Sequence, residues 1–269
     1  MLTYQINSKN HETHYLFIDG GYFDKILNKI GFEFWDTENV EIDYSKVGSS
    51  YNKVFYYNCL PGKRNGESDN DFQKRIQTRE DFYNDLKLLN NYHVFEGVTF
   101  GRKNKIRQKA VDIMIAVDML RHSYRKNMDK ATLLTGDLDF KPLLDALVLE
   151  GMHTSILYSK ESISTELLYS ADSNKRIKIR DIFDWIQDDK KYKYSMPVFH
   201  QSLIIENPTI KREGITVNGQ VTLMTRNQNE FWLETKRDRE RNGSYWKFDN
   251  EEKLLRFYED WTDLKIEWK

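Results

Sequence analysis

Four aspartates occupy positions from which their carboxylates could act together. Asp19 ends the apolar run F-I-D and is followed by two glycines. Asp137 and Asp139 follow another apolar run in T-G-D-L-D, and Asp112 lies in the helical pattern K-A-V-D-I-M-I-A-V-D. Clustered carboxylates raise one another's pKa unless a cation compensates their charge. Oxygen ligands without Cys or His select a hard divalent ion, Mg²⁺ or Mn²⁺. Such an ion can activate water and stabilise the charge that develops on a phosphodiester.

The elements that would bring these aspartates together alternate between strands and helices. Strands are predicted at Tyr15–Asp19, Lys53–Cys59, Tyr92–Glu96, Ala131–Thr135 and Thr154–Tyr158. Helices are predicted at about Gly21–Ile30, Asp71–Leu89, Ala110–Tyr124, Asp139–Glu150 and Ser162–Tyr169. This order is typical of an α/β fold, a doubly wound and mostly parallel sheet with helices on both faces. Ligands of such sheets bind beyond the carboxyl ends of the strands. The first and fourth strands can be neighbours, which would bring Asp19 close to Asp137.

A structural interpretation competes with the metal site at each aspartate. A single aspartate at such a position more often caps a helix or shapes a turn, and Asp139 could cap the helix whose first turn tolerates Pro142. Four aspartates at the expected strand and helix ends favour the metal site. Asp118 is six residues after Asp112, about 120° around the helix and roughly 9 Å along it. We therefore expect Asp118 to pair with Arg121 or His122 instead.

Two basic segments accompany the predicted carboxylate cluster. The first directly precedes the helix of Asp112 and contains Arg102, Lys103, Lys105, Arg107 and Lys109. The second follows the second strand and contains Lys63, Arg64, Lys74, Arg75 and Arg79. We expect these cations to hold a phosphate backbone, although a run of charges is equally typical of a solvated loop. Tyr22, Tyr56 and Tyr57 could stack on bases, but aromatic residues in strands more often belong to the core.

The composition of the 269 residues bounds the class of protein. Lys and Arg number 41 against 42 Asp and Glu, so the net charge is −1 and any affinity for a polyanion must come from local patches. One cysteine excludes an intramolecular disulfide, and together with six scattered histidines it excludes a zinc ribbon. No apolar run approaches the roughly 20 residues of a membrane span, and the first residues lack a signal-peptide pattern. A cytoplasmic protein without a membrane partner is expected.

Several motifs resemble one known family. The chain reads F-I-D-G-G-Y, Y-Y-N-C-L-P-G, Q-K-A-V-D-I-M-I-A-V-D-M-L and L-L-T-G-D-L-D-F-K-P-L-L-D-A-L-V-L-E-G-M. In this order and separation they are similar to the LabA-like branch of the NYN domain family, which has the PIN-like nuclease fold. The resemblance covers about residues 15–176. It implies a metal-dependent, ribonuclease-type centre built from Asp19, Asp112, Asp137 and Asp139.

The resemblance also assigns roles to neighbouring residues. Lys109 matches the basic residue that the family carries before the helix aspartate, and Thr135 stands where the family usually has a small or hydroxylated residue. The Thr135 hydroxyl could orient Asp137. Two positions depart from the family. Tyr22 replaces an Asn three residues after the first aspartate, and Ala110 replaces the Gly of the motif K-G-V-D. Loss of the Asn removes an amide that could position water or ligand.

The C-terminal part of the chain follows another pattern. Short strands are predicted at Leu203–Ile205, Gln220–Thr225, Glu230–Thr235 and Ser244–Phe248, followed by a helix at about Glu251–Trp261. We place a boundary near Pro197, between a nuclease domain at residues 1–195 and a small β-rich domain at residues 196–269. The second domain is expected to select substrate, to cover the active edge, or to contact a protein partner or a second copy of the chain.

These observations predict a Mg²⁺- or Mn²⁺-dependent endoribonuclease, with DNA as the alternative substrate. A second hypothesis is an RNA-binding or regulatory module of the same fold without turnover, acting through a protein partner; Tyr22 and the balanced charge favour it. A phosphatase of the haloacid dehalogenase type needs D-x-D after the first strand, whereas this chain reads Asp19-Gly20-Gly21.

Overall fold

The computed structural model describes residues 12–97, 99–100, 107–108, 110–201, 205–237 and 243–269. The chain divides into two compact units, and each unit is built from two separate stretches of sequence. The first unit comprises Met1–Lys29 and Asp43–Ile177, and the second comprises Ile30–Ile42 and Lys178–Lys269. Helix α1 (Gly20–Trp35) therefore begins in the first unit and ends in the second.

The first unit is built on a six-stranded sheet in which every pair of neighbouring strands is parallel. Its order is β3-β2-β1-β6-β7-β8. The strands are β1 (His14–Asp19), β2 (Lys53–Cys59), β3 (Tyr92–Gly97), β6 (Lys130–Leu134), β7 (His153–Tyr158) and β8 (Ser173–Arg176). The α/β fold class and the pairing of the first and fourth predicted strands are confirmed. Strand β8 was not predicted, because its sequence S-N-K-R carries no apolar signal.

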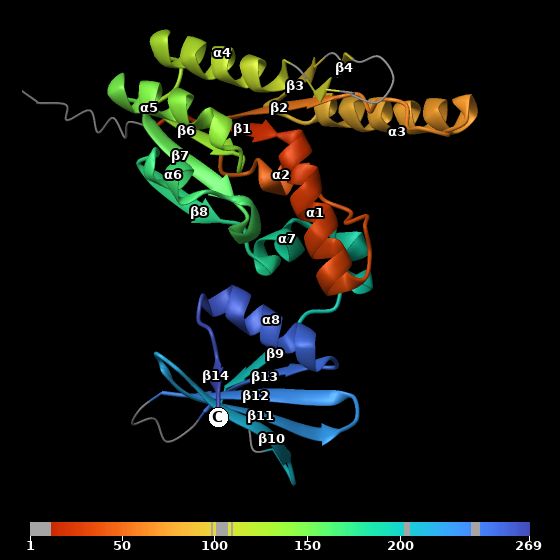
Figure 1. The fold of residues 1–269 in the computed structure, drawn as a ribbon, viewed down its shortest axis with the longest axis vertical. Coiled ribbons are helices and arrows are strands. Elements are labelled where there is room, and N and C mark those ends of the chain that lie inside the picture. The colour runs from red at the N-terminus through yellow and green to blue at the C-terminus, as the bar shows by residue number, and fades with distance from the viewer. Residues whose placement is uncertain (1–11, 98, 101–106, 109, 202–204, 238–242) are drawn as a thin grey trace, which may run out of the picture. The chain divides into compact units, whose positions relative to one another are not determined.

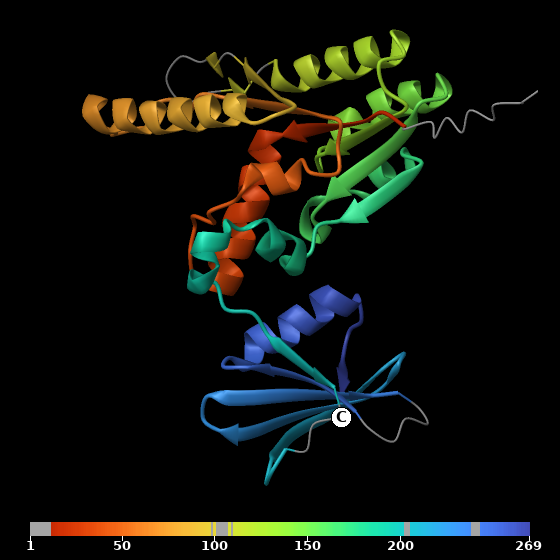
Figure 2. The ribbon, with the colours of Figure 1, turned by 180° about the vertical axis from the view of Figure 1, so that it is seen from behind.

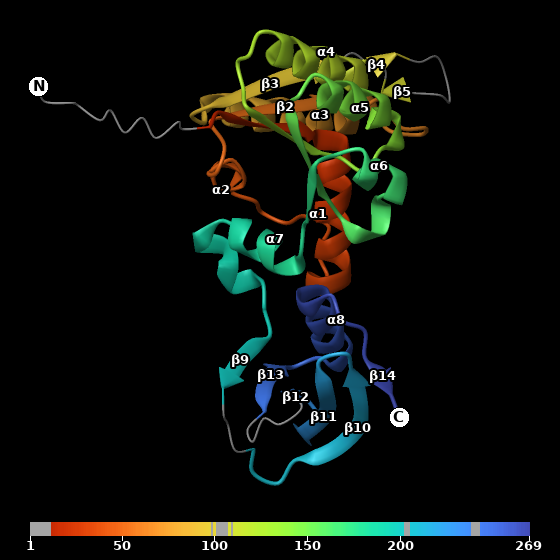
Figure 3. The same cartoon turned by 90° about the vertical axis from the view of Figure 1, so that its left-hand side faces the viewer.

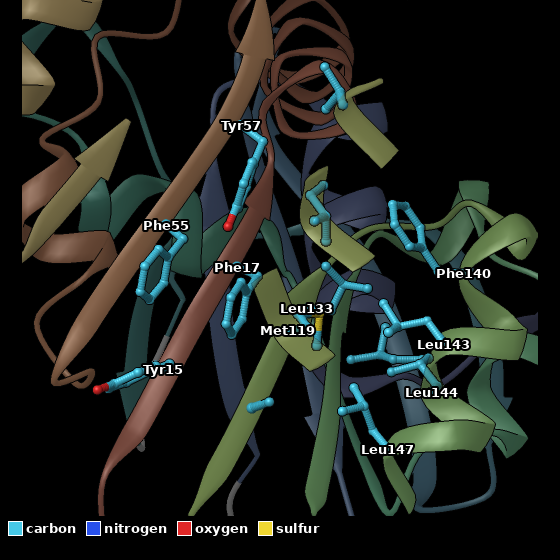
Figure 4. Packing of buried hydrophobic residues seen from close by; sticks show 14 of the residues in the cluster. Tyr15, Phe17, Phe55, Tyr57, Met119, Leu133, Phe140, Leu143, Leu144 and Leu147 are labelled. Atoms are coloured by element: carbon cyan, nitrogen blue, oxygen red, sulfur yellow. The ribbon is translucent and has the colours of Figure 1, made fainter. Parts of the chain in front are cut away.

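Helices cover both faces of this sheet (Figures 1 and 2). They are α2 (Tyr44–Val47), α3 (Asp69–Leu88), α4 (Val111–Tyr124), α5 (Lys141–Leu149) and α6 (Thr165–Tyr169), with the 3₁₀ turns η1 (Leu138–Phe140) and η2 (Lys160–Ser162) and a short ribbon of β4 (Thr99–Phe100) and β5 (Arg107–Gln108). The core on the α4 and α5 face gathers Phe17 and Phe55 from the strands, Met119 from α4, and Leu143 and Leu147 from α5 (Figure 4). The apolar period of about 3.6 residues in α4 and α5 supplies this buried face.

The opposite face is closed by α1, α2 and α3 through aromatic rings. Tyr56 on β2 is fully buried and contacts Tyr44 of α2 and Tyr83 of α3, with ring centroids 6.0 and 6.3 Å apart. Phe23 of α1 meets Tyr44 edge to face at 5.9 Å. Because successive residues of a strand point to opposite faces, Tyr56 and Tyr57 pack into different halves of the core. Both rings are fully buried, which agrees with the core interpretation of these tyrosines and leaves no face open to a base.

The second unit contains an antiparallel sheet of order β14-β10-β11-β12-β13-β9 (Figure 3). Its strands are β9 (Val198–Gln201), β10 (Thr209–Thr216), β11 (Gly219–Asn227), β12 (Glu230–Lys236), β13 (Ser244–Phe248) and β14 (Glu267–Trp268), and its helices are α7 (Ile179–Trp185), η3 (Asp188–Lys193) and α8 (Glu251–Thr262). Three of the four predicted strands and the helix are confirmed. The fourth prediction, Leu203–Ile205, falls mostly outside the described residues, and Ile205 itself is not in a strand.

The end of α1 belongs to the core of this second unit. Phe34 is 1 % exposed and stacks on Phe248 of β13, with centroids 6.0 Å apart and planes 9° from parallel. It also contacts Phe257 of α8. Two ion pairs, Glu33 with Arg256 and Asp36 with Lys253, join the same helix end to α8. None of the helices among the described residues is long and apolar enough to cross a membrane.

Candidate active site

Asp19 is the last residue of β1, at the carboxyl edge of the parallel sheet. Its partly buried carboxylate accepts hydrogen bonds from the backbone N–H of Tyr22, at 3.1 Å, and from the hydroxyl of Thr135, at 3.3 Å. Burial, with a smaller contribution from the nearby charge of Asp112, raises the pKa of Asp19 to about 6, although the two hydrogen bonds and Lys25 act to lower it. The fold therefore brings the pKa of this carboxyl group close to neutral pH.

Thr135 links the ends of two neighbouring strands. It directly follows β6, and its side chain is fully buried. The hydroxyl donates to the carboxylate of Asp19 and accepts the backbone N–H of Asp137 at 3.2 Å. The hydroxyl therefore contacts the main chain of Asp137 and the carboxylate of Asp19 at once.

Asp137 and Asp139 share one turn between β6 and α5. Asp137 caps the 3₁₀ turn η1, because its Oδ1 accepts the backbone N–H of Asp139 at 3.0 Å. The prediction that Asp139 caps the following helix is wrong: the residue before α5 is Phe140, and Pro142 takes one of the first helical positions. Pro142 has no N–H to cap, so α5 starts directly from the turn. Both aspartate side chains are exposed at the edge of the sheet.

Asp112 brings a fourth carboxylate from the first turn of α4. Burial raises its pKa, and the charges of Asp137 and Asp139 raise it further. Because Asp112 in turn raises the pKa of Asp19, the four carboxylates form one electrostatically coupled group drawn from three parts of the fold. The helix begins after Ala110, whose φ of 90° is left-handed. The glycine that the NYN-like motif carries here would adopt this conformation without the steric cost that Ala bears.

The chemistry of this donor set fits a hard divalent cation. Four carboxylates supply oxygen ligands alone, and the raised pKa values of Asp19 and Asp112 indicate that an added positive charge would offset their burial and the repulsion from neighbouring carboxylates. As placed, the described residues include no group of three His, Cys, Asp or Glu side chains close enough to hold a metal ion. Metal binding at this edge therefore requires side-chain rotation of the exposed carboxylates toward Asp19.

The basic residues expected around the site fall into two classes. Arg102, Lys103, Lys105 and Lys109 lie outside the described residues, and Arg107 is described only as part of β5. In the second segment, Lys63 forms an ion pair with Asp69, Arg75 with Glu67 at 2.7 Å and Arg79 with Asp24 at 2.9 Å, while Arg64 and Lys74 are exposed. Ion pairing neutralises much of the charge that the sequence suggested for phosphate binding.

Tyr22 has a structural place beside the carboxylates. Its ring is 8 % exposed, and its hydroxyl accepts the backbone N–H of Ser159 at 3.0 Å and donates to the carbonyl of Ser162 at 3.4 Å. A Cβ on Gly136 would lie 2.5 Å from this ring and 1.9 Å from the Ser162 carbonyl oxygen. The prediction that Tyr22 stacks on a base is therefore wrong, because the ring is packed between the turn after β6 and the chain after β7.

Asp118 has a partner that the sequence did not indicate. Its Oδ2 accepts a hydrogen bond of 2.9 Å from the hydroxyl of Tyr57 on β2, whereas His122 contacts Asn127 instead. No described hydrogen bond or ion pair joins Asp118 to Arg121 or His122, although the Asp118 charge does raise the pKa of His122 against the larger lowering effect of burial. Helical spacing alone could not reveal a partner 61 residues away.

A second polar cluster beside the site was missed. Asn58 donates to the carboxylate of Asp24 at 3.2 Å and to the hydroxyl of Tyr56 at 3.3 Å, and Arg79 completes the cluster through Asp24. A Cβ on Gly20 would lie 2.6 Å from the Tyr56 oxygen and 2.9 Å from the Asn58 amide nitrogen. The cluster holds the start of α1 tightly against the end of β2. In the sequence, the one sign of this cluster was Asp24, an acidic residue one helical turn after Gly20 and Gly21.

A family comparison assigns the chain to a known domain family. The NYN domain model matches residues 34–178, just over half of the chain, a segment that contains Asp112, Asp137 and Asp139 and begins after Asp19. A crystal structure of a protein of unknown function from Vibrio parahaemolyticus is similar, with a TM-score of 0.47, 14 % sequence identity, and coverage of 64 % of this chain and 96 % of that one. No curated protein matches. The chain belongs to the NYN domain family, whose members have a PIN-like nuclease fold.

Proposed function

We propose that this protein is a Mg²⁺- or Mn²⁺-dependent endoribonuclease of the LabA-like branch of the NYN family. The observation that carries the proposal is the coupled group of Asp19, Asp112, Asp137 and Asp139 at the carboxyl edge of the sheet, where burial and mutual repulsion raise the pKa of two of its members. Structural carboxylates are ordinarily paired with cations or hydrogen-bond donors that lower their pKa. Clustered carboxylates with raised pKa values are typical of functional sites.

In this proposal the aspartates would hold the ion, and Lys109 with the segment 102–107 would hold the phosphate backbone. When bound, the ion activates water and stabilises the charge that develops on the phosphodiester. Thr135 keeps Asp19 and the turn of Asp137 together through its hydroxyl. The protein itself would therefore supply placement and charge, and RNA is the proposed substrate, with DNA as the alternative.

The test compares cleavage of a labelled RNA by the wild type and by Asp137→Asn. We expect cleavage with Mg²⁺ or Mn²⁺, none with EDTA, and a loss of at least a hundredfold in the variant, because removing one ligand charge weakens the ion and misplaces it. Asp85→Asn, an exposed aspartate of α3, is the matched control. Equal activity in the wild type and Asp137→Asn would refute the assignment.

A binding module without turnover is the second candidate. It is favoured by two observations: the described residues contain no ready group of three metal ligands, and Tyr22, in place of the family's Asn, is used in packing. This function predicts RNA affinity that falls with salt and survives Asp137→Asn, without any cleaved product. The same assay, read for bound rather than cut RNA, separates the two functions.

A further inference from the structure

The second unit contains a cavity of about 360 Å³. It is lined by residues of the β-sheet and by the C-terminal end of α8, which carries Tyr258 and Trp261. From the sheet, Phe199 of β9 and Trp246 of β13 are register partners, so their side chains lie on the same face. Ligand pockets range from about 300 to 1,000 Å³, so this cavity is large enough for one small ligand.

Aromatic rings form one side of the cavity. The ring centroids of Phe199 and Trp246 are 4.8 Å apart, and those of Trp246 and Trp261 are 6.4 Å apart. Phe199 is 47 % exposed and Trp261 is 42 % exposed, whereas Phe257, which stacks on Trp261, is buried. The rings at the cavity are thus anchored to the core on one side and open on the other. Such an arrangement suits stacking of a planar aromatic ligand.

Polar groups of two kinds complete the lining. Gln201 and Gln220 can each donate and accept hydrogen bonds, as the edges of nucleobases require, and Thr235, whose hydroxyl donates to the Ser244 carbonyl, can accept one. Lys236 and Arg237, at the end of β12, add two exposed cations. The described lining residues include no aspartate or glutamate. The cavity therefore favours a ligand that is flat and aromatic, has hydrogen-bonding edges, and carries negative charge.

We propose that this cavity binds one unstacked nucleotide of a single-stranded nucleic acid. A base inside a duplex is stacked and paired, and taking it out costs a few kcal/mol, so a cavity of this size selects single strands. The inference rests on the proposed function, because it specifies the substrate class of the same nuclease. The cavity chemistry is common to RNA and DNA, so the experiment distinguishes these two sources.

The test measures binding to the full-length protein by fluorescence anisotropy in EDTA, which suppresses metal-dependent cleavage. The probes are a labelled single-stranded RNA of seven nucleotides, the DNA of the same sequence, and the corresponding duplexes. We expect both single strands to bind at least tenfold more tightly than their duplexes. A preference for RNA over single-stranded DNA would identify RNA as the natural source, and the reverse preference would identify DNA.

Two substitutions in the cavity have matched controls outside it. Phe199→Ala removes a stacking ring and is expected to weaken single-strand binding about tenfold, whereas Phe32→Ala, at an exposed position of α1, leaves it unchanged. Lys236→Ala is expected to lower the salt dependence by about 0.7 in log–log slope, the value for one phosphate contact on a single strand. Lys265→Ala, an exposed lysine outside the lining, is its control.

A measurement on the wild type needs no substitution. All six tryptophans of the sequence lie in the second unit, and Trp246 and Trp261 line the cavity. A nucleoside monophosphate should quench tryptophan emission and compete with the labelled strand. Absence of competition, equal affinity for single strands and duplexes, or equal binding by Phe199→Ala and Phe32→Ala would overturn the inference.

These outcomes are separable from those of the nuclease proposal. If Asp137→Asn cuts RNA as the wild type does while the cavity variants bind more weakly, the catalytic assignment fails and the cavity stands. If cleavage requires Asp137 while the cavity variants bind like their controls, the cavity inference alone fails.

Discussion

At the scale of single residues, the buried carboxyl group of Asp19 lowers the stability of the folded protein when it is ionised. Its carboxyl group lies at the end of a buried strand, where desolvation disfavours the charged form. Two hydrogen bonds, from Tyr22 and Thr135, compensate only in part, because the pKa still rises to about 6. At neutral pH the metal-free protein thus carries an ionised group that the fold does not favour. A cation at this edge would remove that penalty.

This cost predicts a pH-dependent stability. A folded-state pKa above the unfolded value of about 3.8 means that the contribution of Asp19 to stability is full below pH 3.8 and is lost as the pH rises through 6. Asp19→Asn removes the titration, so at pH 7.5 the variant should be more stable than the wild type by up to about 3 kcal/mol. The advantage should shrink toward pH 4.

Urea denaturation between pH 4 and pH 8 in EDTA measures this difference, with the exposed Asp85→Asn as control. A stability gain of Asp19→Asn that did not change with pH would contradict the assigned cause. Addition of Mn²⁺ should stabilise the wild type and leave Asp19→Asn nearly unchanged, because an ion that binds only the folded state raises the free energy of unfolding by an amount that grows with the logarithm of its affinity.

At the scale of elements, the site depends on the turn that joins β6 to η1. Gly136 lies between Thr135 and Asp137, and the space where a side chain would be is filled by the Tyr22 ring and the carbonyl of Ser162. The turn, the start of α1 and the chain after β7 are therefore packed together around one position that has no side chain. This packing fixes Asp137 relative to Asp19, on the neighbouring strand.

Gly136→Ala should accordingly disturb both stability and activity. A methyl group 1.9 Å from the Ser162 carbonyl oxygen forces the backbone to move, and we expect a loss of about 3 kcal/mol, the upper end for overpacking. Gly66→Ala is the control: Gly66 has a φ of +76° with open space around its Cβ position, so only the left-handed backbone cost of about 1–2 kcal/mol applies. Thermal denaturation of the two variants measures these losses of stability. Equal losses in Gly136→Ala and Gly66→Ala would contradict the tight packing proposed around Gly136.

At the scale of the whole molecule, neither compact unit is continuous in sequence. Residues 30–42, at and after the end of α1, belong to the same compact unit as residues 178–269. Phe34 is the centre of this attachment, since it contacts Phe248 and Phe257. The β-rich unit therefore needs a piece of chain that precedes most of the NYN domain in sequence, and the two units share helix α1.

Phe34→Ala tests this organisation against Phe32→Ala, two residues away on the same helix. Phe34 is 1 % exposed and Phe32 is 63 % exposed. Truncating a buried phenylalanine costs about 3–5 kcal/mol, whereas an exposed one should cost less than about 0.5 kcal/mol. Because all six tryptophans lie in the second unit, their fluorescence reports the unfolding of that unit directly. Similar midpoints for the two variants in urea would show that Phe34 is not part of its core.

The sequence by itself determined the alternation of strands and helices, the order of the carboxylates along the chain, and the neighbouring positions of the strands that precede Gly20 and Thr135. These features are readable because apolar periodicity and turn residues act within a few positions along the chain. The same local signals did not predict the edge strand β8, because its sequence is polar although it forms part of the sheet.

Only the tertiary structure decided which side chains meet. The hydrogen bond from Tyr57 to Asp118, the contacts of the Tyr22 hydroxyl with the chain after β7, the ion pairs that neutralise part of the second basic segment, and the place of Phe34 in the second unit all join distant residues. No periodicity encodes such contacts, because each depends on the packing of several elements at once. The places of the carboxylates on the strands and helices were therefore predictable, but the hydrogen bonds and packing around them were not.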